Sequence, residues 1–148
     1  MAKHVWSVLC SRAILDKYTN NVSLIDSLEN VEFAPPRPFK EGQWSVIGGL
    51  EATLVSFVVR SDVSVPEEVK LRIQLVAPNG QPNEAFVTAN VSLMNHARVR
   101  NYFSMRGIGF WSSGQHKFVV SMETSPDKWE SVAEIPLDIK QSVPKTDN

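Results

Sequence analysis

The feature that constrains this chain most is an alternation of apolar and polar residues that recurs in four separate segments. Successive side chains of a β-strand point to opposite faces, so apolar residues at every second position line one face. The pattern runs through Leu71–Ala77, Glu84–Leu93, Arg98–Arg106 and Trp129–Ile139. A helix over any of these segments would bring polar side chains into a core. Each segment is therefore predicted to be a half-buried strand.

Other segments add to the predicted strands. Val5–Cys10 and Leu54–Val59 are apolar on both faces, which is typical of central strands covered on both sides. Phe118–Met122 is a further short strand, and Asn20-Asn21 is expected to close a hairpin that ends near Leu28. Together these segments predict an all-β chain.

Turn sequences separate the strands at Pro78-Asn79-Gly80, Ser112-Ser113-Gly114 and Ser125-Pro126-Asp127. Their regular spacing predicts an antiparallel β-sandwich of about seven to nine strands. A chain of 148 residues has the length for one ordinary core. We expect a single domain over residues 1–140 and a frayed polar tail over 141–148.

Four places depart from the simple strand pattern. Pro136 cannot donate to a ladder, so its strand is expected to be an edge or to carry a bulge there. Gly107-Ile108-Gly109 is expected to be a bulge or a bend that redirects the strand, because no helix follows it to form a phosphate site. Trp129 keeps the apolar phase of its strand and is predicted to be in the core. Ala34–Gly49 is the longest segment without strand pattern, which is typical of a functional or mobile loop.

Charge and cysteine content limit the partners. The net charge is -1, from 15 Lys and Arg against 16 Asp and Glu, so binding to nucleic acid or anionic lipid would need a local patch. Cys10 is the single cysteine, which excludes an internal disulfide, fits a reducing compartment and is predicted to be a buried thiol. No segment has the length of a signal peptide core or a membrane span, so the expected location is the cytoplasm.

Two parts of the chain resemble a family of short bacterial proteins of unknown function. Val8–Asp16, a polar turn and Val22–Asp26 are similar to the opening of that family. Leu71–Gly80, Gly114–Phe118 and Ile135–Leu137 are similar to strands of its sandwich. The resemblance implies an immunoglobulin-like or C2-like fold, and it brings no catalytic residues with it.

Catalytic and metal-binding patterns are weak. Ser113, His116 and Asp127 could form a nucleophile, base and acid, but no Gly-x-Ser-x-Gly elbow accompanies them. A hydrolase therefore stays open only as a minor alternative, and an enzyme is not expected. His4 and His96 are far in sequence from His116 and lack metal-ligand spacing, so neither a metal nor a cofactor is expected.

One strand carries a cationic face, which consists of Arg98, Arg100, Tyr102 and Arg106 with His96 at its head. Guanidinium groups beside an aromatic ring are suited to an anion, a nucleic-acid backbone or an acidic partner. The alternative is a solvated face whose arginines pair with carboxylates of neighbouring strands, such as Glu84 or Glu123. Trp44 and Trp111 lie in loop sequences, where they either cap the sandwich or mark contact sites.

Two functions follow from these features. The first is a non-catalytic interaction or structural module that contacts a protein partner or a second copy. Its contact would be the Ala34–Gly49 loop, the Trp111 turn or an exposed edge strand. The alternative is a binder of a small anionic or sugar-like ligand, held by Arg98, Arg100 and Arg106. Neither function includes specific nucleic-acid binding or a membrane span.

Overall fold

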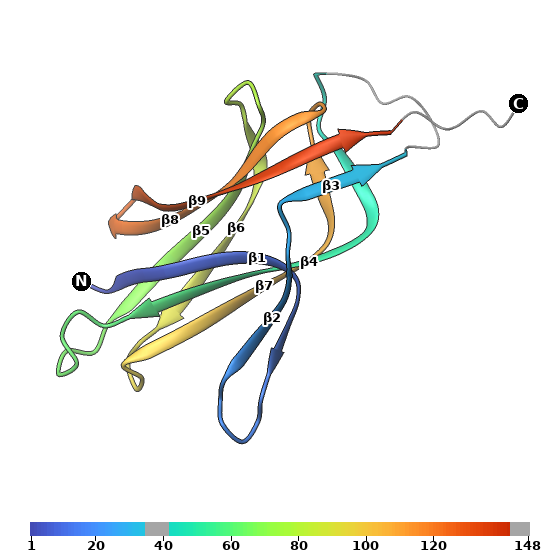
Figure 1. The fold of residues 1–148 in the computed structure, drawn as a ribbon. Helices are drawn as coiled ribbons and strands as arrows, with labels where there is room; N and C mark the ends of the chain where they lie inside the picture. Colours follow the sequence, from blue (N-terminus) through green and yellow to red (C-terminus); the bar gives the residue numbers. More distant parts are fainter. Residues whose placement is uncertain (35–41, 143–148) are drawn as a thin grey trace, which may run out of the picture.

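Two β-sheets face one another in a computed structural model that describes residues 1–34 and 42–142, apart from the side chains of residues 47–49 and 86. Sheet A contains, in spatial order, β2 (Val22–Ser27), β1 (Lys3–Leu15), β4 (Ser45–Val59) and β7 (Arg98–Phe110). Sheet B contains β3 (Asn30–Phe33), β9 (Lys128–Gln141), β8 (Gly114–Ser125), β5 (Glu68–Val76) and β6 (Pro82–Ser92). The described residues form no helix, and Figure 1 shows the two sheets as the layers of a sandwich. The predicted all-β sandwich is confirmed.

The alternating segments are strands that bury one face. In β5, Val69, Leu71, Ile73 and Leu75 are buried, whereas the residues between them are half-buried or exposed. The strand ladders are antiparallel, except that β3 pairs with β9 in parallel. The fold is thus mixed at one edge of sheet B, where the sequence predicted antiparallel strands throughout.

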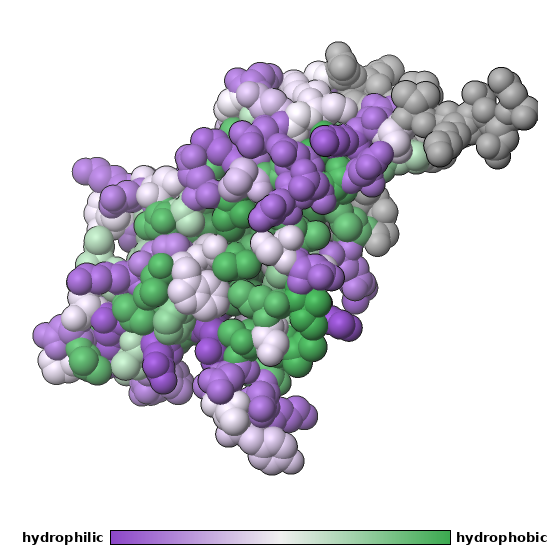
Figure 2. Space-filling model, in the orientation of Figure 1, coloured by the Kyte–Doolittle hydropathy of each residue, from purple (hydrophilic) through white to green (hydrophobic). Residues whose placement is uncertain are grey.

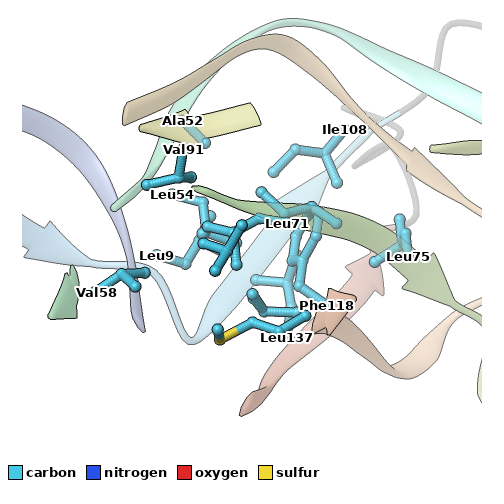
Figure 3. Packing of buried hydrophobic residues seen from close by; sticks show 14 of the residues in the cluster. Leu9, Ala52, Leu54, Val58, Leu71, Leu75, Val91, Ile108, Phe118 and Leu137 are labelled. Carbon is cyan, nitrogen blue, oxygen red and sulfur yellow. The ribbon is translucent and has the colours of Figure 1, made fainter. Parts of the chain in front are cut away.

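The hydrophobic core lies between the sheets and takes side chains from both of them. Figure 3 shows Leu9, Leu54 and Ile108 of sheet A close to Leu71 and Leu137 of sheet B. Each of these five side chains is at most 1% exposed. Close packing of this kind makes the inter-sheet layer the main source of stability in a chain without disulfides.

The central strand β4 is buried on both faces, as its sequence predicted. Leu54 and Val58 belong to the core cluster, whereas Val55 points to the opposite face and is also 0% exposed. On that outer face of sheet A, the rings of Trp6 and Phe57 pack with their centroids 5.5 Å apart. An outer face of this kind needs a covering layer, because buried apolar side chains must be shielded from water.

The β1–β2 hairpin forms at the predicted turn. Asp16 donates its backbone N–H to the Asn21 carbonyl, and its own carbonyl accepts from the Asn20 N–H, both at 2.9 Å. Asn20 has a φ of 57°, a left-handed conformation that asparagine tolerates better than most residues. The hairpin continues beyond the part of β1 that pairs with β4, and it projects from the sandwich in Figure 1.

Two proline and glycine predictions are confirmed. β3 joins β9 only from Asp138 onward, so at Pro136 the strand has a ladder partner on one side, β8. At the Gly107-Ile108-Gly109 segment the β4–β7 register shifts between Ile47 and Glu51, and Gly107 has a φ of 114°. A left-handed φ at this bulge is a conformation that glycine adopts readily.

The loop prediction for Ala34–Gly49 is only partly correct. Residues 35–41 lie outside the described residues, but β4 already begins at Ser45. Gly48 and Gly49 are accommodated inside the strand, because the irregular register places three residues of β4, 48–50, opposite one of β7, Gly107. The predicted frayed tail over 141–148 begins too early, since β9 continues to Gln141. Residues 143–148 lie outside the described residues.

The core prediction for Trp129 is wrong. The β8–β9 register shifts between Val120 and Ser121, which moves the residues before Val132 onto the opposite face. Trp129 therefore lies half-buried on the outer face of sheet B, where the Arg72 guanidinium sits 4.6 Å from the ring centroid. A single extra residue in a strand moves the side chains beyond it to the face opposite the one that alternation predicts.

Because Leu71 lies in the core and Trp129 lies on an outer face, replacing each by alanine should lower stability by different amounts. Leu71→Ala should lower the free energy of unfolding by about 3 kcal/mol, because Leu71 is 0% exposed in the inter-sheet core. Trp129→Ala should cost about 1 to 2 kcal/mol, since it removes a cation–π contact and partial burial from a surface. Urea unfolding measures both values, and a greater loss in Trp129→Ala than in Leu71→Ala would contradict the assigned faces.

Candidate functional site

The cationic face predicted from the sequence lies on β7, the edge strand of sheet A. Arg98, Arg100 and Tyr102 pair in register with Val59, Phe57 and Val55 of β4. Val55 points away from the core, so the three β7 side chains also lie on the outer face of the sheet. Arg98 and Tyr102 are exposed, and Arg100 is half-buried.

The tip of the β1–β2 hairpin meets this face. The Arg100 guanidinium donates a hydrogen bond to the backbone carbonyl of Asn20, a residue 80 positions earlier in the chain. The contact borders an open pocket of about 400 Å³, which we call the hairpin pocket. Its hairpin wall consists of Leu15, Thr19, Asn20 and Asn21. Its sheet wall consists of Phe57, Arg98, Val99, Arg100 and Tyr102, and His96 of the loop before β7 completes the lining.

Arg106, a fourth predicted site residue, is separate from this pocket. It pairs in register with Glu51 of β4, farther along β7 than the hairpin tip reaches, and it is not among the lining residues. The three arginines share one face of β7, but the hairpin tip contacts only one end of that face. Arg98, Arg100 and Tyr102 are brought together, and Arg106 is not.

The carboxylate pairing considered for these arginines is wrong. Glu84 and Glu123 lie on β6 and β8, both in sheet B, whereas the ladder partner of β7 is β4. The Glu123 carboxylate pairs with Lys70 at 3.1 Å. In residues 1–34 and 42–142, no carboxylate lies within ion-pair distance of the arginines of β7. The hairpin pocket therefore holds two guanidinium groups whose charge no described carboxylate neutralises.

Sequence reasoning missed half of the pocket. Leu15, Thr19 and Phe57 had no apparent role, and Asn20-Asn21 was assigned only to a turn. The turn assignment was the one available signal, since it located the hairpin tip correctly. No local pattern shows that the tip folds back toward β7, because that contact joins distant parts of the chain.

Trp44 and Trp111 lie away from the hairpin pocket and contact one another. Their ring centroids are 5.6 Å apart in an edge-to-face arrangement, and Trp44 is 6.2 Å from the ring of His116. Trp44 packs against the core cluster, and a Cβ built on Gly109 would lie 3.6 Å from its indole ring. Both tryptophans are half-buried, which favours the capping interpretation over a contact site.

His116 anchors this aromatic cluster and is 0% exposed. Its Nε2 accepts the backbone N–H of Trp111 at 3.0 Å, so the proton of the neutral ring must be on Nδ1, which contacts the Gly114 carbonyl at 3.2 Å. Burial lowers the pKa of His116, and the hydrogen bond with Gly114 raises it by a smaller amount. The site therefore fits the neutral imidazole.

The residues of the hydrolase alternative are not gathered into one site. His116 uses its two nitrogens for Trp111 and Gly114 at the start of β8. Asp127 lies in the turn after the other end of β8, where its backbone N–H donates to Glu123 at 3.1 Å. Residues at opposite ends of a strand of 12 residues cannot form a triad.

A different polar chain was not predicted. His4 Nε2 and Ser7 Oγ are 2.7 Å apart, and Ser7 Oγ lies 2.7 Å from Ser56 Oγ. Ser56 is 0% exposed and points into the interior with Leu54. Burial lowers the pKa of His4 as well, with an opposing contribution from a hydrogen bond to the Trp6 backbone. The chain satisfies polar groups inside the sandwich.

Cys10 is a buried thiol, as predicted. It is 0% exposed, and its Sγ donates to the Thr53 carbonyl at 3.4 Å. Burial raises the pKa of this thiol. Within the described part of the chain, no three His, Cys, Asp or Glu side chains gather in a metal-binding arrangement. The same residues contain no helix that is long and apolar enough to cross a bilayer.

Comparison with known proteins supports the fold and no particular activity. No family model and no curated protein matches the chain. A solved structure of the C-terminal domain of wzt is similar, with 12% identity and a TM-score of 0.50 over 96% of this chain and 75% of that one. A β-glucosidase from Listeria innocua in complex with gluconolactone has 11% identity and a TM-score of 0.43, over 68% of this chain and 16% of the enzyme. The likeness to the wzt domain supports the sandwich fold alone, and the resemblance to a bacterial family stays a prediction.

The buried state of His116 predicts a pH dependence of stability. Its pKa is lowered in the folded chain, so the unfolded chain binds more protons once the pH falls below the ordinary histidine pKa of about 6.5. Stability from this group is fully present above that pH and is lost as the pH falls toward the folded pKa. The free energy of unfolding, measured in urea, should therefore decrease on acidification from neutral pH.

Substitution separates the contribution of His116 from that of His4. His116→Gln should reduce the slope of unfolding free energy against pH just below neutrality. Adding His4→Gln to that variant should remove the part of the slope that is left. Carboxylates with lowered pKa values, such as Asp16 and Asp62, contribute only at more acidic pH. An unchanged slope in His116→Gln would show that the imidazole is not the group responsible.

Proposed function

We propose that this chain is a non-catalytic binding module and that its hairpin pocket takes a small anionic or sugar-like ligand. One observation carries the proposal: Arg98 and Arg100 line the same pocket without a described carboxylate to neutralise them. Guanidinium groups bind carboxylates and phosphates through paired N–H donors of fixed geometry. An anion entering this pocket would replace water around two positive charges at once.

The other lining residues support a polar ligand that also has an apolar edge. Arg100 uses one guanidinium nitrogen for the Asn20 carbonyl, and the group has further N–H donors for a ligand. The side chains of Thr19 and Asn21 can exchange hydrogen bonds with hydroxyl groups. Phe57 and Tyr102 supply ring surface against which a sugar or a similar molecule can pack.

The composition of the pocket also supports binding rather than catalysis. Among its described lining residues there is no carboxylate, serine or cysteine. Acid–base or nucleophilic catalysis at His96 would need a partner group that orients the imidazole or forms the covalent intermediate. The pocket instead combines cations, amides and rings with the hydroxyl groups of Thr19 and Tyr102, and Thr19 Oγ1 already accepts the Asn21 N–H at 3.3 Å. These groups hold a ligand by complementarity.

Thermal unfolding in the presence of simple anions tests this proposal. Inorganic phosphate and glucuronate should raise the melting temperature of the wild-type chain, whereas glucose should have a smaller effect. At a ligand concentration ten times the Kd, we expect a rise of about 3 °C. The Arg98→Ala and Arg100→Ala variants should each lose most of this rise.

Arg106→Ala is the matched control, because Arg106 lies on the same face of β7 but outside the hairpin pocket. It should keep the full anion-dependent rise. Absence of a rise with every anion, or an equal rise in all three arginine variants, would refute specific binding in the pocket.

A second candidate function is self-association through the β7 edge. β7 has 13 residues, and its segment before Gly107 lacks the lysine and proline that blunt many edge strands. Size-exclusion chromatography with light scattering should then give the mass of a dimer. Ser104→Lys on β7 should produce monomers, and Val87→Lys on β6, the edge strand of sheet B, should not. A monomer mass for the wild-type chain at every concentration would exclude this candidate.

A further inference from the structure

We infer that the anion bound by the hairpin pocket belongs to the headgroup layer of an anionic phospholipid membrane, which the β1–β2 hairpin contacts with its exposed apolar side chains. This inference rests on the proposed function, since it names the source of the anion. The net charge of -1 offers no general attraction to such a surface, so a local patch is required.

The hairpin has an unusual number of exposed apolar groups for a short segment. Tyr18 at the tip is 99% exposed. Behind it, Leu15 and Leu24 lie on one face of the hairpin and are 45% and 36% exposed, and Ile14 lies on the other face and is 47% exposed. Tyr102, across the pocket, is 40% exposed. Figure 2 shows hydrophobic residues gathered over the base of the hairpin and the adjoining sheet. Clustered exposed apolar groups mark contact surfaces for proteins or membranes.

The charges around these groups are predominantly positive. Arg98 and Arg100 line the pocket behind the tip, and Lys17 and Arg12 lie on the hairpin itself. The opposing carboxylates on the hairpin are Asp16 and Asp26.

Asp16 uses one carboxylate oxygen within the turn, where Oδ1 accepts the Tyr18 and Thr19 N–H groups at 2.8 and 3.2 Å. These bonds hold the pKa of Asp16 below its ordinary value. The carboxylate therefore stays ionised at neutral pH. Arg12 and Lys17 offset Asp16 and Asp26 on the hairpin, so the excess positive charge of this surface comes from Arg98 and Arg100 of the pocket.

The shape of the surface favours a membrane over an acidic protein. The hairpin projects from the sandwich, and the aromatic residue at its tip is almost fully exposed. Hot spots for protein partners are usually enclosed in packed pockets, whereas tyrosine is enriched where a membrane meets water. A tip that enters the interface would bring the arginines behind it to the level of the lipid phosphates.

Sedimentation with lipid vesicles tests the inference on the full chain. Vesicles of phosphatidylcholine with added phosphatidylserine should bind the wild-type chain, and vesicles of phosphatidylcholine alone should bind it much less. Each of Arg98→Ala and Arg100→Ala should weaken binding about five-fold. Added salt should weaken the wild-type interaction as well, because it screens exposed charges.

A variant with both Tyr18→Ser and Ile14→Ser isolates the apolar contribution. Neither residue lines the hairpin pocket, so the thermal response to phosphate should persist while vesicle binding falls at least about five-fold. Val87→Ser is the matched control, since Val87 is 51% exposed on β6 of the other sheet, and it should bind vesicles as the wild type does.

The outcomes separate this inference from the proposed function. A thermal response to phosphate without binding to phosphatidylserine vesicles would overturn the membrane inference and leave the anion pocket in place. Binding to immobilised polyglutamate in preference to the vesicles would overturn it in favour of an acidic protein partner. If the wild-type chain shows neither a thermal response to phosphate nor vesicle binding, the anion pocket itself is refuted.

Discussion

Burial of both faces of β4 is the constraint on which the rest of the structure depends. One face places Leu54 and Val58 in the inter-sheet core, and the other places the fully buried Val55 on the outside of sheet A. Apolar side chains on the outer face must be shielded from water, and packing of Trp6 on Phe57 supplies part of that cover. Because Phe57 also lines the hairpin pocket, the strand that holds the fold together contributes directly to the candidate site.

The pocket follows from a second contact on the same face, between the hairpin tip and Arg100. A backbone carbonyl accepts one guanidinium donor without cancelling its charge, so the contact positions the arginine and leaves it cationic. The same contact brings amide and hydroxyl groups of the turn near Arg98 and Tyr102. The hairpin therefore has a dual role, as one wall of the pocket and as the most exposed part of the proposed contact surface.

The Trp44–Trp111–His116 cluster shows a different use of polar and aromatic groups. Here the histidine is fully buried and each ring nitrogen has a backbone partner, so the cluster closes the sandwich near the start of β8. In the hairpin pocket, by contrast, His96 and Arg98 are exposed. Residues that looked similar as site candidates are thus distinguished by whether their polar atoms are satisfied within the fold.

The sequence by itself determined the class of fold and the faces of most strands, because alternation is a local property of a pleated backbone. It placed Arg98, Arg100 and Tyr102 on one polar face, located the Asn20-Asn21 turn and indicated that Cys10 is buried. Only the tertiary structure decided that a bulge moves Trp129 outward, that Arg106 is separate from the other arginines and that Glu84 and Glu123 are in the other sheet. These outcomes depend on which strands become neighbours and how far the hairpin folds back, and contacts between residues distant in the chain decide both.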